Sequence, residues 1–157
     1  MHRFSVQSLT ALILSANLSL GMAAGPALGT ATARGSFTID NASIAGNATL
    51  FEGNHIETGK ASSQLQLNNG ARMQLAADSS GIVYRDRLVL EKGTEGGNFQ
   101  VEANSLRIRP AGKTSGAQVS IRESGTVQVA ALNGPVRVTA ANGVLLATFQ
   151  EGRNLAF

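Results

Sequence analysis

The residues best suited to chemistry lie around His55, which has Glu52 and Glu57 close by in the sequence. An imidazole beside carboxylates can serve as an acid–base pair or as part of a metal site. In a strand, His55 and Glu57 would share a face, because side chains two residues apart point the same way. A zinc site needs further ligands, and His55 is the only histidine after residue 33. We therefore expect no metal site and interpret His55 as an exposed polar residue.

Other catalytic arrangements are incomplete. A nucleophilic triad would need Ser79, His55 and Asp78, but the G-x-S-x-G elbow around the serine is missing. The glycine-rich Gly93–Gly97 lacks the Lys-Ser or Lys-Thr of a phosphate-binding loop. The chain has no cysteine, which excludes disulfides and thiolate sites. Aromatic residues make up only 4% of the chain, which disfavours a sugar-cleaving cleft. We predict a protein that is not an enzyme, with no catalytic residues, no metal and no cofactor.

The basic residues gather only modestly along the chain. Thirteen Lys and Arg against ten Asp and Glu give a net charge of +3. Without interleaved aromatic residues to stack bases, this pattern indicates no nucleic-acid partner. A solvated sheet face, or contact with a polyanionic envelope polymer or lipid headgroups, remains open for this group. Its members are Arg107, Arg109, Lys113, Arg122 and Arg137.

The N-terminal residues have the pattern of a secretory signal peptide. Arg3 precedes the mostly apolar Leu9–Leu20, and Ala31-Thr32-Ala33 fits a cleavage site of the A-x-A type. The apolar run is shorter than the roughly 20 residues that a membrane span needs. We therefore predict a signal peptide over residues 1–33 and a mature domain over 34–157, periplasmic or secreted and without a membrane span. An earlier cut after Ala24 is the alternative.

Alternating apolar residues predict strands in the mature chain. Leu65 and Leu67 precede Asn69-Gly70, and Met73 and Leu75 follow it. This pattern predicts a β-hairpin with positive φ at both turn positions.

The glycines of the C-terminal half predict regularly spaced turns. Five of them are nine residues apart, and short alternating runs lie between them. These segments lack the Asp ligands of a calcium-binding nonapeptide repeat. We predict an all-β single domain of short antiparallel strands, arranged as a meander, a sandwich or a solenoid-like stack. The five glycines are Gly116, Gly125, Gly134, Gly143 and Gly152.

The stretch from Leu50 to Ser80 carries a family pattern. It combines glycines, x-Thr-Gly, an alternating strand, a glycine turn and a closing serine. The matching positions are Gly53, Ile56, Thr58, Gly59, Ser62, Leu65, Leu67, Gly70, Leu75 and Ser79 or Ser80. This pattern resembles the FecR-type domain, and the likeness extends from about Gly35 to Gly152.

The resemblance implies a β-rich periplasmic domain of the kind found in regulators of extracytoplasmic-function sigma factors. We expect only that β-rich part here, behind a cleavable leader. The motif residues Gly53, Ile56, Thr58, Gly59 and Gly70 are expected to shape the fold rather than bind a ligand. The glycines would adopt backbone conformations that a Cβ disfavours, and Thr58 would hydrogen-bond its own turn.

Together these features predict a non-catalytic protein-interaction module of the cell envelope, with a role in signalling as one option. Its partner would be another envelope protein, bound through sheet edges or polar loops. The alternative is a structural module that self-associates through exposed β edges.

Overall fold

The computed structural model describes residues 25–157, and the regular structure in this range consists only of β-strands. The prediction of an all-β single domain is confirmed. None of the described residues forms a helix long and apolar enough to cross a membrane. The leader features Arg3 and Leu9–Leu20 lie outside the described residues.

Fourteen strands form one continuous hydrogen-bonded system. Their pairings are antiparallel apart from the short parallel pair between β7 and β8. The strands are β1 (Gly29–Ile39), β2 (Ala42–Leu50), β3 (His55–Thr58), β4 (Ser63–Leu67), β5 (Arg72–Leu75), β6 (Ser80–Val83), β7 (Leu88–Gly97), β8 (Val101–Ala103), β9 (Leu106–Pro110), β10 (Gly116–Ile121), β11 (Val127–Asn133), β12 (Val136–Ala140), β13 (Leu145–Phe149) and β14 (Asn154–Ala156).

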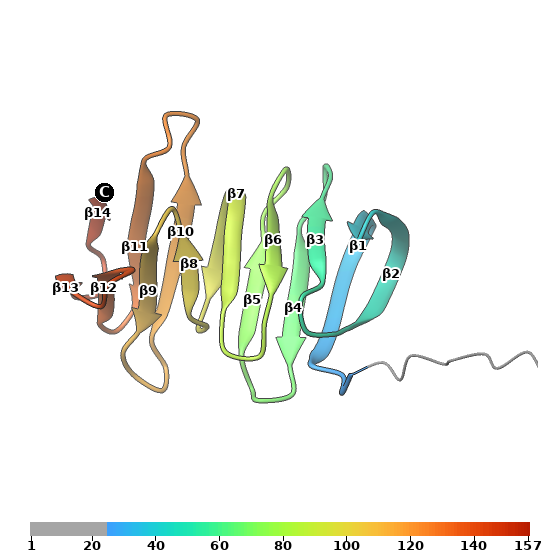
Figure 1. Cartoon of the computed structure of the whole chain (residues 1–157), viewed down its shortest axis with the longest axis horizontal. Coiled ribbons are helices and arrows are strands. Elements are labelled where there is room, and N and C mark those ends of the chain that lie inside the picture. Colours follow the sequence, from blue (N-terminus) through green and yellow to red (C-terminus); the bar gives the residue numbers. More distant parts are fainter. Residues whose placement is uncertain (1–24) are drawn as a thin grey trace, which may run out of the picture.

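The strands are arranged in two layers that share β1 and β7 (Figure 1). Six strands close a barrel-like ring in the order β1, β4, β5, β7, β6 and β3. Beyond β7 the layers continue separately, one through β8, β9, β12 and β13 and the other through β10, β11 and β14. β10 lies against β8 and β9. The domain is therefore closed at the β1–β2 end and open between β13 and β14.

The core lies between the layers and follows the period-2 alternation of the strands. In β4, Ser63, Leu65 and Leu67 point inward while the two glutamines between them are exposed. Aliphatic side chains dominate the interior, and only a few phenylalanines are buried among the described residues. Burying each Val or Leu contributes about 2 kcal/mol, so the many short strands together can hold the fold. The buried phenylalanines are Phe37, Phe99 and Phe149.

The hairpin expected around Asn69-Gly70 joins β4 and β5, but its turn differs from the expected type. Gly70 has φ of 89°, whereas Asn69 is not among the residues with positive φ. Gly70 N donates to Leu67 O at 3.0 Å, and Leu67 N donates to Ala71 O at 2.9 Å. These bonds describe a type I turn followed by a left-handed glycine, which is a common longer hairpin connection.

Strand β7 changes layers at Gly93. Before this residue β7 pairs with β6, and from Gly93 onward it pairs with β10. Gly93 has φ of 83°, and a Cβ there would lie 2.7 Å from Ser79 Cα. Ser79 is buried and accepts a hydrogen bond from Thr94 N at 2.9 Å. Only glycine allows β7 to pass this close to Ser79 with a left-handed backbone.

The domain begins before the boundary expected from the leader. Residues 29–33 form the first half of β1 and pair with both β2 and β4. Leu28 is buried, and its N–H donates to Leu50 O at 2.7 Å. The boundary between Ala33 and Arg34 therefore divides a core strand. A cut after Ala24 would leave β1 whole.

Truncation tests whether the fold needs residues 25–33. A chain that starts at Arg34 is expected to unfold with a free energy at least about 2 kcal/mol lower than one that starts at Gly25, since burial of Leu28 alone contributes this much. Urea unfolding followed by circular dichroism measures the difference. Equal midpoints for the two chains would show that Leu28 and the first half of β1 are dispensable.

Two glycines of β7 give a matched test of the crossing. Gly93→Ala is expected to lower the free energy of unfolding by at least about 2 kcal/mol, because it adds a left-handed alanine and a clash with Ser79. Gly96→Ala is the control, since a Cβ there meets nothing closer than Ala117 O at 3.9 Å. Thermal and urea unfolding of both variants should separate them; equal stability would contradict the role of Gly93.

Candidate functional site

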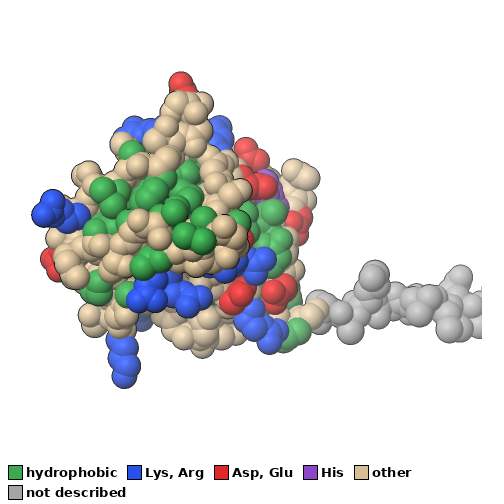
Figure 2. All heavy atoms as spheres, turned by 60° about the vertical axis from the view of Figure 1, so that its left-hand side comes forward, with side chains coloured by type: hydrophobic (Ala, Val, Ile, Leu, Met, Phe, Trp, Pro, Cys, Tyr) green, Lys and Arg blue, Asp and Glu red, His purple; other side chains and the backbone are tan. Residues whose placement is uncertain are grey.

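The open end of the domain exposes apolar side chains that the rest of the described surface does not. Figure 2 turns this end forward and shows hydrophobic side chains gathered at its centre, with Lys and Arg along the lower border. The exposed large apolar residues come from β11, from β14, and from β13 and its preceding turn. They are Leu132, Val144, Leu145, Leu146 and Leu155. We call them the open-end cluster.

A bulge in β13 explains why adjacent leucines are exposed. Val138 of β12 pairs with Ala147, but Thr139 pairs with Leu145, so Leu146 is an extra residue. A bulge breaks the alternation that would otherwise bury one of two neighbouring side chains. Leu145 and Leu146 are therefore 55% and 47% exposed.

Both strands at the open end have one free edge. Among the strands of residues 25–157, β13 pairs only with β12, and β14 pairs only with β11. Neither strand contains a charged residue. Natural edge strands are usually protected by charges, prolines or covering segments. The open end thus combines unpaired backbone groups with exposed apolar side chains, the two components that strand addition uses.

His55 is paired with a different carboxylate from those near it in the sequence. Its Nε2 lies 2.8 Å from Glu91 Oε2 of β7, and both side chains are partly exposed. Glu57 shares the outer face of β3 with His55, while Glu52 lies 3.7 Å from Arg85. Residues 25–157 contain no group of three His, Cys, Asp or Glu side chains that could hold a metal ion.

The triad considered in the sequence is not assembled. Ser79 is buried, and its hydroxyl donates to Ala77 O at 3.2 Å and accepts from Thr94 N. His55 is instead engaged with Glu91 on the outer surface. Asp78 has φ of 54° in the turn before Ser79. These contacts give Ser79 a structural position at the crossing of β7.

The basic residues are divided between the two layers. Arg109 and Arg137 face each other across β9 and β12, and Arg107 lies on the same outer face. Glu102 Oε1 lies 3.1 Å from Arg107, and Glu102 Oε2 lies 3.2 Å from Arg87. The other two residues of the expected group lie elsewhere, in the loop before β10 and after β10 in the other layer. They are Lys113 and Arg122.

The motif residues occupy turns and the core of the ring. Ile56 is fully buried, and Gly53 and Gly70 have positive φ, whereas Gly59 has ordinary φ and room for a Cβ. Thr58 Oγ1 donates to Ala76 O at 2.5 Å and accepts from Ser79 N at 2.9 Å. Thr58 thus ties β3 to the loop before β6 rather than to its own turn.

Glu95 is a buried carboxyl group that the sequence analysis did not single out. It is 1% exposed, and its inward-facing neighbours on β5 and β10 are Leu75 and Val119. Its Oε1 has no hydrogen-bond partner among the described residues. Burial raises the pKa of Glu95 to about 8, because the apolar surroundings disfavour the charged form. The only sign in the sequence that Glu95 is buried is its position two residues after Gly93, on the inward face of the strand.

Replacing Glu95 tests its protonation in the fold. The raised pKa means that the folded state keeps a proton that the unfolded chain loses above about pH 4.5. Stability should therefore be greatest below pH 4.5 and fall by roughly 4 kcal/mol as the pH rises to about 8. Glu95→Gln should remove this decline, as measured by urea unfolding across the pH range.

The control for this experiment is Glu57→Gln, because Glu57 is exposed on β3. It should leave the pH dependence unchanged. An identical pH profile for Glu95→Gln and the unmodified protein would contradict a protonated, buried Glu95.

Comparisons with known proteins add no functional assignment to this geometry. No protein-family model, no curated protein and no solved structure matches the chain. The function is therefore inferred from the residues and surfaces described above.

Proposed function

We propose that this chain is a FecR-like, non-catalytic protein-interaction module of the cell envelope, and that it binds its partner through the open end. The observation that carries the proposal is the open-end cluster between two uncharged edge strands. The signal-peptide pattern supports an envelope location. The likeness to the FecR-type domain is supported by the motif residues Gly53, Ile56, Thr58, Gly59 and Gly70.

Strand addition is the binding mode that suits this surface. An extended segment of the partner would pair with the free edge of β13 and satisfy its unpaired N–H and C=O groups. Its apolar side chains would cover Val144, Leu145 and Leu146, which removes apolar surface from water. Main-chain pairing supplies a general attraction, and the side chains supply selectivity.

Arginines beside the open end favour an acidic flank on the partner segment, while the exposed Glu151 in the turn between β13 and β14 carries the opposite charge. Arg137 lies on β12 next to β13, and Arg153 directly precedes β14. Both are exposed. The preferred partner is therefore an apolar, extended segment with an acidic residue beside it. Such charges mainly speed association and select among partners.

Self-association is the second candidate, and the β1–β2 end favours it. Within the described part of the chain β2 pairs only with β1, and its sequence contains no charged residue. The edge of β13 in one copy and the edge of β2 in the next would form a head-to-tail contact. A contact of this kind grows into open chains of subunits unless its rotation closes a ring.

Charge insertion at the open end tests the leading proposal. Leu145→Lys combined with Leu146→Lys should lower partner capture at least about tenfold, as expected for central apolar contacts. Both side chains are half exposed, so the fold should survive the change. Ala111→Lys combined with Thr114→Lys is the control, because it adds the same two charges at exposed positions of the loop between β9 and β10, outside the open end. The measurement is quantitative cross-linking capture from a native envelope extract, with each variant as bait.

The same variants separate the two candidates. One captured protein that is lost with the Leu145/Leu146 variant and kept with the Ala111/Thr114 control supports the interaction module. Concentration-dependent multimers in light scattering, again removed by the Leu145/Leu146 variant, favour self-association instead. Capture that is equal for all baits contradicts a role for the open end.

A further inference from the structure

The layer that contains β4 and β10 has an uncharged polar ladder on its outer face. In-register partners form one row across β2, β1, β4, β5, β7, β10, β11 and β14. Gly96 and Ala130 occupy two places in this row, and the other six are amides or a hydroxyl. These six are Asn47, Thr32, Gln64, Gln74, Gln118 and Asn154. We call this row the amide ladder.

The amides of this face are available to a ligand. Gln64, Gln66 and Gln118 make no side-chain hydrogen bond to any residue in 25–157, while Gln74 Nε2 donates to Ser62 Oγ at 3.2 Å. Each primary amide offers two donors and an acceptor oxygen. The exposed faces of antiparallel sheets are usually polar. This row crosses eight strands without a charged side chain, so its amides suit the hydroxyl groups of a ligand, which also donate and accept hydrogen bonds.

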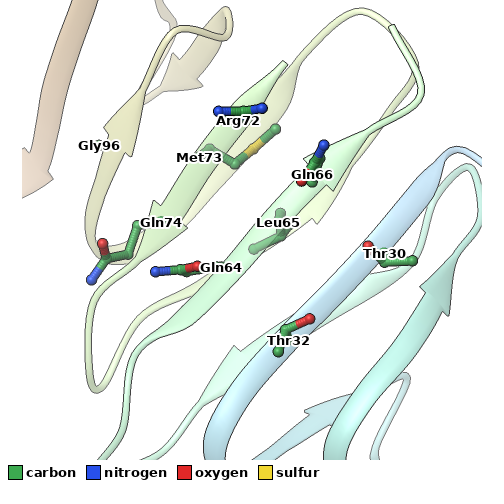
Figure 3. Close-up of a pocket in the computed structure, with 9 residues that line it drawn as sticks. All are labelled: Thr30, Thr32, Gln64, Leu65, Gln66, Arg72, Met73, Gln74 and Gly96. Atoms are coloured by element: carbon green, nitrogen blue, oxygen red, sulfur yellow. The ribbon is translucent and has the colours of Figure 1, made fainter. Parts of the chain in front are cut away.

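A hollow of about 400 Å³ opens on the ladder where Gly96 lies (Figure 3). Thr32, Gln64 and Gln74 border it together with Arg72. The fold does not require a glycine here, because Gly96 has ordinary φ and a Cβ would have ordinary contacts. The missing side chain leaves a path along the ladder between β5 and β10.

The charges at the margin of the ladder are positive. Arg72 borders the hollow and makes no ion pair with any described residue. Arg122 lies toward β11 and donates from Nε to Gln128 Oε1 at 2.9 Å. A second hollow of this face lies beside Arg122 and Gln128. The residues that border it and those that border the hollow at Gly96 include no carboxylate. A ligand that is rich in hydroxyl groups and carries some negative charge is therefore favoured.

We propose that the amide ladder binds an acidic polysaccharide, which lies across the strands with its hydroxyl groups on the amides and its carboxylates near Arg72 and Arg122. A single hydrogen bond of this kind changes affinity by only about fivefold. The ligand therefore has to be a polymer that contacts several strands at once. The ladder ends on β14 beside the open end, but Arg72 and Gly96, which the test changes, lie on β5 and β7. The proposal therefore does not depend on the partner proposed above.

Alginate, a polymer of uronic acids, is the probe, and binding to the purified protein is measured by isothermal titration. Gly96→Val should weaken binding at least about tenfold by filling the hollow, while thermal unfolding remains unchanged or rises, since a β-branched residue suits a strand. Arg72→Gln should weaken binding about fivefold. Neutral dextran should bind at least about tenfold more weakly than alginate.

Arg137→Gln is the matched control, because it removes the same charge from the opposite layer. It should leave the affinity for alginate unchanged. Equal weakening by Arg72→Gln and Arg137→Gln would show that binding depends only on the net charge of the protein, which would overturn the proposal. No detectable binding of alginate, binding of dextran as tight as alginate, or full binding by a folded Gly96→Val variant would overturn it as well. If Gly96→Val does not fold, the two arginine variants decide the question.

Discussion

The structure depends on the passage of β7 from one layer to the other. The first half of this strand pairs with β6 and β8, and the second half pairs with β5 and β10. The strand therefore closes the ring and begins both open layers. The passage requires a left-handed residue without a side chain beside Ser79, which Gly93 provides. Ser79 in turn is bonded to Thr58 and Thr94. Gly93 and the hydroxyl groups of Thr58 and Ser79 thus connect the closed ring to the open layers.

The same passage places a carboxyl group in the core. Glu95 follows Gly93 by two residues and shares the inward face with Leu75 and Val119. A buried group without partners lowers stability, and keeping the proton avoids the larger cost of a buried charge. The strand that joins the layers therefore also contains the residue that couples stability to pH.

Joining the layers at one end and separating them at the other creates three different surfaces. The outer face of one layer carries the amide ladder, and the face of the other carries Arg107, Arg109 and Arg137. The open end shows apolar side chains because no further strand from residues 25–157 covers the core beyond β13 and β14. A small all-β domain thus presents the surfaces on which the two binding proposals rest.

The sequence by itself determined the all-β class and several of the turns. Period-2 alternation around Asn69-Gly70 and the regularly spaced glycines reflect local backbone preferences, which need no distant contact. It did not determine that His55 meets Glu91, that Glu95 is buried without a partner, or that six polar residues form one ladder. These contacts join residues far apart in the chain, and the register of strand pairing decides them. The place of residues 29–33 is decided in the same way, since only their pairing with β2 and β4 shows that they belong to the first strand.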